Sequence, residues 1–119
     1  MAYEIVSIDG PVIQVRISGT MQLVDQQALQ AAAKKLIAQG IKPRVLVSAE
    51  NFQGWEKGVD WGDVSFLMDF GDGIVKMAIV GDEKWKEQVF MFTAKGLRKT
   101  AIEYFPPAAL AQALAWVRA

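Results

Sequence analysis

The feature that most constrains the fold is a run of seven residues, 74–80, that are almost all apolar and β-prone. Such a run predicts a strand that is buried on both faces. Gly81 and Asp82 then end the strand, and Asp82 is well placed to cap the N-terminus of a following helix. A strand that runs directly into a helix is half of a βαβ unit. In open α/β sheets this junction borders the ligand crevice.

In the rest of the chain, segments with the two-residue hydrophobic period of a strand alternate with segments that have the helical period of about 3.6 residues. This alternation is expected of an α/β domain. Asp9-Gly10 is a hairpin turn signal between the first two strands, which makes the first strand antiparallel to the others. The pattern predicts strands over residues 3–8, 12–18, 44–49, 74–80 and 98–104, helices over 22–39, 59–70, about 83–93 and 106–116, and irregular structure over 50–58. Residues 1–119 therefore form one domain with a five-stranded mixed sheet and the order ββαβαβαβα.

Three basic residues occupy similar places in their strands. Arg16, Arg44 and Lys76 each lie on the face opposite a neighbouring apolar residue. A sheet covered evenly by helices on both faces does not repeat this pattern. We therefore expect the helices to gather mostly on one face and to leave the other face amphipathic.

Composition narrows the function classes. Lysine and arginine together number 13, as do aspartate and glutamate, so no basic surface for nucleic acid is expected. The chain has no cysteine and no histidine, which excludes thiolate catalysis, the usual catalytic triad and most transition-metal sites. We expect no enzyme activity, no metal and no cofactor. The N-terminus has no signal-peptide pattern and no run could span a bilayer, so a cytoplasmic protein is expected.

Several segments together resemble one family. They are residues 76–82 with Trp85, residues 103–105, and Ala113 with Trp116. The chain is similar to the SpoIIAA-like proteins, which are related to STAS domains and grouped with the lipid-binding CRAL-TRIO (Sec14-like) fold. The resemblance covers nearly the whole chain and implies a SpoIIAA/STAS-like fold. It also implies a non-catalytic binding module.

The resemblance permits a test of one regulatory device. STAS domains of the anti-sigma-factor antagonist type carry a phosphorylatable serine or threonine at the start of the helix after the third strand, where a helix N-terminus suits a phosphate. Here residues 50–60 contain no hydroxyl side chain. Ser48 precedes this segment and Ser65 lies inside the following predicted helix. The usual phospho-switch is therefore not expected.

Aromatic residues near the end of the third strand are the first candidate site. They predict either the lip of a pocket for an apolar ligand or a cap over the core above the strand ends. In the first interpretation the pocket lies between the second and third predicted helices. Its predicted lining residues are Phe52, Trp55, Trp61, Phe66, Phe70, Trp85 and Val89.

Two polar candidates have simpler alternatives. Gly81 and Asp82 precede a helix, whose N-terminus could hold an anion, although a capping aspartate explains both residues without a ligand. Carboxylates could instead bind Mg²⁺ or act as acid and base, but such residues near helix ends are usually solvated. The carboxylates concerned are Asp60, Asp63, Asp69 and Asp72.

The helices carry more apolar residues than one small domain needs to bury. Trp85, Val89 and Phe92 point inward, yet Phe90 and Met91 also need cover. A homodimer interface or a lipid-sized cavity would account for the excess. The leading hypothesis is a binding module for an apolar or lipid-like small molecule. The alternative is a STAS-like protein-interaction module in regulation that uses residues 50–60 and the second predicted helix.

Overall fold

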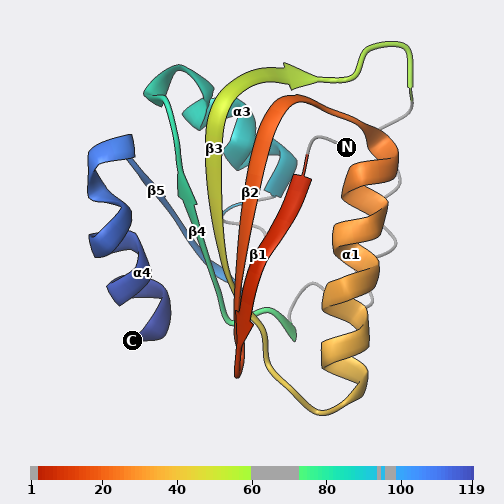
Figure 1. Cartoon of the computed structure of the whole chain (residues 1–119), viewed down its shortest axis with the longest axis vertical. Helices are drawn as coiled ribbons and strands as arrows, with labels where there is room; N and C mark the ends of the chain where they lie inside the picture. Colours follow the sequence, from red (N-terminus) through yellow and green to blue (C-terminus); the bar gives the residue numbers. More distant parts are fainter. Residues whose placement is uncertain (1–2, 60–72, 94, 96–98) are drawn as a thin grey trace.

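The computed structural model describes residues 3–59, 73–93, 95 and 99–119. Its five strands form one sheet in chain order, β1-β2-β3-β4-β5 (Figure 1). β1 is antiparallel to β2, and the other three pairings are parallel, which confirms the predicted fold class. The strands are β1 (Tyr3–Asp9), β2 (Val12–Met21), β3 (Arg44–Trp55), β4 (Lys76–Val80) and β5 (Ala101–Phe105).

The described helices agree with the predicted ones, apart from their exact ends. They are α1 (Leu23–Ala38), α3 (Lys86–Thr93) and α4 (Leu110–Arg118), with the short 3-10 helices η2 (Glu83–Trp85) and η3 (Pro107–Ala109). Gly40 follows α1 with a φ of 82°, the left-handed conformation that commonly ends a helix. The helix predicted over residues 59–70 lies, beyond its first residue, outside the described part of the chain.

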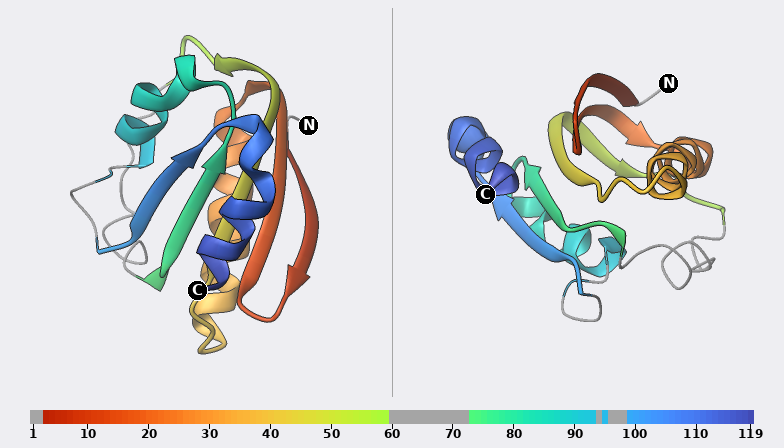
Figure 2. Two further views of the ribbon diagram at one scale, coloured as in Figure 1. Left: turned by 90° about the vertical axis from the view of Figure 1, so that its left-hand side faces the viewer. Right: turned by 90° about the horizontal axis from the view of Figure 1, so that it is seen from below.

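The strand order explains how the helices are distributed. Each parallel connection steps in the same direction across the sheet, and such connections are right-handed in nearly all proteins. The connecting helices must therefore share one face. α1 and α3 do so, whereas α4 follows the last strand and packs on the opposite face against β3 and β4 (Figure 2). For the described helices the prediction holds in part: α1 and α3 share one face, but α4 covers β3 and β4 on the face that was expected to be amphipathic.

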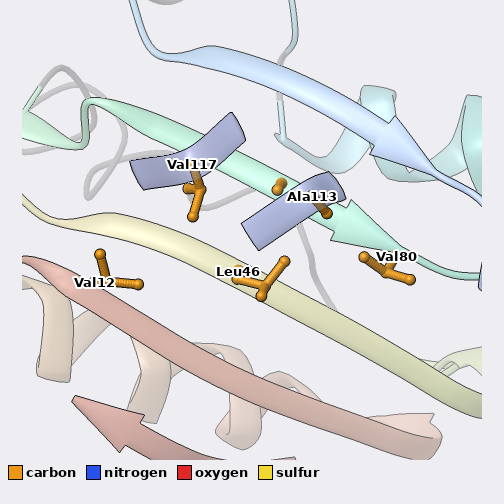
Figure 3. Packing of buried hydrophobic residues seen from close by; sticks show 6 residues of the cluster. Val12, Leu46, Val80, Ala113 and Val117 are labelled. Carbon is orange, nitrogen blue, oxygen red and sulfur yellow. The ribbon is translucent and has the colours of Figure 1, made fainter. Parts of the chain in front are cut away.

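A cluster of buried side chains lies beneath α4. Ala113 and Val117 of the helix and Ala78 of β4 are fully buried, and Leu46 of β3 is only 1% exposed (Figure 3). Val12 and Val80 complete this group of buried side chains. Because Ala78 and Ala113 are small, the helix backbone can lie close to the sheet. Such close-packed interiors leave little room for extra methylene groups.

Two of the three basic strand residues bind the C-terminal end of α4. The guanidinium Nη1 of Arg44 donates to the carbonyl of Val117 at 2.8 Å, and the ammonium of Lys76 donates to the carbonyl of Trp116 at 3.0 Å. Carbonyls in the last turn of a helix lack partners within the helix, and cations there also complement the helix dipole. These two side chains therefore attach the C-terminal end of α4 to the first residues of β3 and β4.

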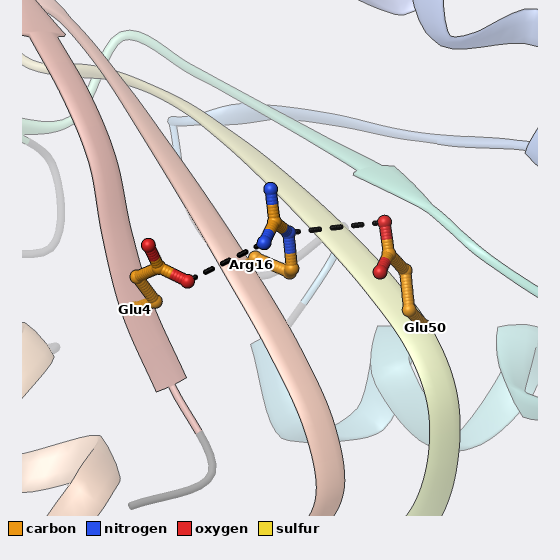
Figure 4. A network of polar contacts seen from close by, with 3 residues as sticks. All are labelled: Glu4, Arg16 and Glu50. Carbon is orange, nitrogen blue, oxygen red and sulfur yellow. Dashed lines mark hydrogen bonds and ion pairs between the residues drawn. The ribbon is translucent and has the colours of Figure 1, made fainter.

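The third basic residue is part of an exposed network on the same face. Arg16 on β2 lies 3.4 Å from a carboxylate oxygen of Glu4 on β1 and 3.8 Å from one of Glu50 on β3 (Figure 4). More than two fifths of each of these side chains is exposed. This part of the sheet is polar, as the predicted amphipathic face requires.

β2 and β3 are longer than the sequence predicts. Gly19 and Thr20 continue β2 instead of ending it, and β3 runs on through residues 50–55, which had been expected to be irregular. The prediction for these residues was wrong because the pair accommodates irregular steps. Its register shifts around Gly19, and Asn51 adopts a left-handed φ of 50°. A bulged strand keeps its partner while it bends and twists.

Candidate functional site

A cavity of about 470 Å³ lies between the sheet and the two helices α1 and α3. This volume falls within the usual range for small-molecule pockets, about 300–1,000 Å³. β1, β2, β3 and β4 form its floor, and Met91 on α3 is 79% exposed at its edge. The floor side chains are Ile5, Ile13, Val15, Ile17, Val45, Val47, Ala49, Met77 and Ile79. The cavity is therefore a large apolar space beside the central strands.

The structure brings together four of the seven predicted lining residues. Phe52, Trp55, Trp85 and Val89 all line the cavity. The other three, Trp61, Phe66 and Phe70, lie outside the described residues, and nothing is concluded about them. Their role as ligand contacts stays a prediction.

The α1 wall of the cavity was not predicted from the sequence. Gln26, Leu29, Gln30, Ala32 and Ala33 line it from this helix. A signal for it was present, because two adjacent alanines occupy the stripe that faces the sheet and fill little space.

An aromatic cluster joins the end of β3 to η2 and α3. The rings of Trp55 and Phe92 are stacked, with centroids 4.3 Å apart and planes 9° apart. Phe52 lies edge-on to Trp55 and Trp85, at centroid distances of 5.0 and 5.1 Å. Rings at these distances attract one another beyond the effect of burial alone. The cluster is half-buried and lines one end of the cavity, so both proposed roles, pocket lip and core cap, fit its position.

Gly54 lets this cluster approach the strand. Its φ is 102°, and a β-carbon at this position would lie 3.2 Å from the Trp85 ring. A larger residue would be strained by the backbone conformation and would press on the indole. The glycine therefore positions Trp85 against β3.

The polar groups around the cavity fall into two kinds. The Thr93 hydroxyl donates to the carbonyl of Val89 at 2.8 Å, and the Tyr104 hydroxyl donates to the carbonyl of Asp82 at 2.7 Å. Partial burial raises the pKa of Tyr104, and the nearby Asp82 carboxylate raises it further. By contrast, the side-chain amides of Gln26 and Gln30 form no hydrogen bond within the described part of the chain.

The predicted helix cap at Asp82 is present. Its carboxylate oxygen Oδ1 accepts a hydrogen bond from the backbone N–H of Lys84 at 3.0 Å. Gly81 is packed closely, since a β-carbon there would lie 2.9 Å from the Tyr104 hydroxyl. The carboxylate thus satisfies one of the free N–H groups that an anion would have bound. An anion site at these two residues stays a prediction.

A metal site and a carboxylate site have little support among the described residues. No group of three or more side chains that commonly bind metals lies together in residues 3–59, 73–93, 95 and 99–119. The four aspartates considered for carboxylate chemistry, Asp60, Asp63, Asp69 and Asp72, lie outside this part of the chain. No described helix is long and apolar enough to cross a membrane.

Comparison with known structures finds the same fold in three solved structures. An uncharacterised protein with a SpoIIAA-like fold from Shewanella loihica PV-4 is 18% identical, with a TM-score of 0.69 over 98% of this chain and 92% of that one. The anti-sigma factor antagonist SpoIIAA in its unphosphorylated form is 14% identical, with a TM-score of 0.62 over 98% of both chains. The phosphorylated form of the Bacillus cell fate determinant SpoIIAA is 16% identical, with a TM-score of 0.52 over 98% of this chain and 100% of that one.

At these identities the likeness concerns the fold alone. None of the three structures is described as a Sec14-like protein, so the CRAL-TRIO part of the resemblance gains no support from them. A search of curated proteins found no relative. The SpoIIAA-like family model matches residues 12–118, nearly the full length. The chain therefore belongs to the SpoIIAA-like family.

Proposed function

We propose that this protein is a non-catalytic regulatory module that binds another protein, as a STAS-like domain does. The observation that carries the proposal is the match of residues 12–118 to the SpoIIAA-like family, together with a fold shared with an anti-sigma factor antagonist. The absence of histidine and cysteine from the sequence removes the commonest catalytic groups and favours binding over catalysis.

The proposed contact surface is the end of β3. Asn51, Gln53 and Lys57 are exposed there, while Trp55 fixes this segment to α3 through its stack with Phe92. The segment is also tied to α1, because the Glu56 carboxylate accepts the backbone N–H of Leu23 at 3.1 Å. Exposed polar side chains on a firmly held backbone are suited to specific recognition. Since residues 50–60 have no hydroxyl, binding here operates without the usual phospho-switch.

Site-specific photo-crosslinking in the native host tests this surface. A photoreactive amino acid replaces Gln53, and a matched variant carries it at Gln112, an exposed glutamine on α4. We expect a discrete crosslinked protein at position 53 that is absent at position 112. The same adducts at both positions, or none at position 53 while the variant is folded and expressed, would contradict the proposal.

A second candidate function is the binding of an apolar or lipid-like small molecule. The observation that favours it is the cavity of about 470 Å³, whose walls are almost entirely apolar. Hydrophobic residues lining a preformed space, with a few polar groups, are typical of ligand pockets. The two functions are compatible, because the cavity and the exposed tip of β3 use different side chains.

Native mass spectrometry of the purified protein distinguishes these candidates from self-association. A mass excess that survives gentle transfer and disappears on denaturation supports a bound small molecule. A dimer without extra mass instead supports a homodimer, in which exposed apolar side chains such as Val24 and Met91 would find cover. A monomer whose mass equals that of the sequence argues against both a bound small molecule and a homodimer.

A further inference from the structure

The four polar side chains that line the cavity differ in what they can still bind. The hydroxyls of Thr93 and Tyr104 already donate to backbone carbonyls. Gln26 and Gln30 lie one turn apart on α1, both half-buried, and neither side chain has a hydrogen-bond partner in the described structure. A primary amide offers donors and an acceptor at once. It can therefore bind a hydroxyl, a carbonyl or another amide.

The described lining of the cavity carries no charged side chain. An ionised head group that entered this space would lose its hydration without gaining a counter-charge from these residues. An uncharged polar head would lose less, and the two glutamine amides could replace its bonds to water. The apolar floor on the sheet would contact the hydrocarbon part of the same ligand.

From this arrangement we infer that the cavity selects an uncharged amphiphile, with an apolar body against the sheet and a neutral hydrogen-bonding head against Gln26 and Gln30. This inference rests on the second candidate function, the binding of an apolar small molecule. It adds the chemical class of that ligand. Neutral alcohols, esters and amides belong to the class, whereas fatty-acid anions and phosphate-bearing lipids do not.

Competitive displacement of a neutral fluorescent probe tests the class. The purified full chain is loaded with N-phenyl-1-naphthylamine, and the probe is displaced by 1-decanol or by decanoate, which have the same chain length and differ in head-group charge. We expect decanol to bind at least about tenfold more tightly than decanoate, because desolvation of an unpaired charge is costly. Decanoate binding as tightly as decanol would overturn the inference.

Substitutions on α1 test the role of the amides. Gln30→Leu keeps a similar volume but removes the hydrogen-bonding group, and Gln27→Leu is its control on the exposed side of the same helix. We expect Gln30→Leu to weaken decanol binding about two- to tenfold, the value of one hydrogen bond, and Gln27→Leu to leave it unchanged. Equal effects of the two variants would exclude a specific role for Gln30.

A third variant separates failure of this inference from failure of the candidate function itself. Ala32→Phe places a ring in the cavity wall, and thermal unfolding shows whether the variant remains folded. If the folded variant loses the probe, the probe occupies the cavity, and the decanol–decanoate comparison then decides the ligand class. If the native protein binds no probe, or the folded variant binds it as well as the native chain does, both the inference and the small-molecule function are wrong.

Discussion

Gly81 and Tyr104 meet where β4 ends, and their contact leaves no space for a methyl group. A β-carbon at position 81 would lie 2.9 Å from the tyrosine hydroxyl and 3.3 Å from the β-carbon of Ala49. We expect Gly81→Ala to lower the free energy of unfolding by about 1–3 kcal/mol, the usual effect of overpacking. Urea denaturation measures this. In a Tyr104→Phe background, where the hydroxyl is gone, the same substitution should cost less; an equal cost would show that the hydroxyl is not the obstacle.

The raised pKa of Tyr104 predicts a pH dependence. Burial and the Asp82 carboxylate raise the pKa above its ordinary value of 10.0, so the phenol ionises first in the unfolded chain. The stabilisation is therefore complete below pH 10.0 and is lost as the pH rises through the folded pKa. As the pH rises above 10.0 we expect the unfolding free energy to fall more steeply in the native protein than in Tyr104→Phe. Parallel pH profiles in chemical denaturation would refute this.

At the residue scale, features that follow from a local rule could be predicted from the sequence. The cap at Asp82 follows from an aspartate between a strand and a helix, and the hydrogen bond to Lys84 is local. The roles of Gln26 and Gln30 could not be predicted. Glutamine on a helix is usually solvated, and only the distance between α1 and the sheet places these two beside a cavity.

At the scale of elements, the end of α4 depends on residues far away in the sequence. Arg44 donates to a helix carbonyl, whereas the contacts of Arg16 within the described residues are exposed ion pairs. We expect Arg44→Met to lower the unfolding free energy by about 1–3 kcal/mol, since hydrogen bonds to charged groups are strong. The matched Arg16→Met should cost no more than about 1 kcal/mol. Equal midpoints of denaturation for the two variants would argue against a special role for Arg44.

The element boundaries show where the sequence misleads. The strand starts at Val12 and Arg44 follow from the apolar alternation. The strand ends do not, because Gly19, Asn51 and Gly54 carry the usual signals for a stop while the pairing of β2 and β3 continues to Met21 and Trp55. The neighbouring strand decides whether a turn-forming residue ends a strand or forms a β-bulge within it.

At the scale of the whole molecule, the two faces of the sheet differ: a cavity lies beneath α1 on one face, whereas a cluster of buried side chains lies beneath α4 on the other. Ala113 on α4 is fully buried, whereas Ala32 on α1 lines the cavity. We expect Ala113→Leu to lower the unfolding free energy by about 1–3 kcal/mol and Ala32→Leu to be neutral or stabilising, because only the second site has space. Similar losses on chemical denaturation would mean that the cavity is closed in solution.

The distribution of the connecting helices follows from the strand order, which the sequence did not predict. Parallel strands added in order, with right-handed connections, place α1 and α3 on one face whatever their detailed sequences. The cavity was predicted between the second and third helices, and four of its seven predicted lining residues do line it, but its α1 wall was not predicted. Its volume depends on how far α1 stands from the sheet, a distance set by many small packing terms that no local pattern encodes.

The chain-order arrangement of the sheet also bears on how the protein is made. Each strand pairs with the one synthesised just before it, so the sheet can extend strand by strand as the chain leaves the ribosome. The face beneath α4 is the exception, because Val12 and Leu46 lie on β2 and β3, whereas the helix that covers them follows β5. During synthesis that apolar strip therefore stays uncovered until α4 has also emerged from the ribosome.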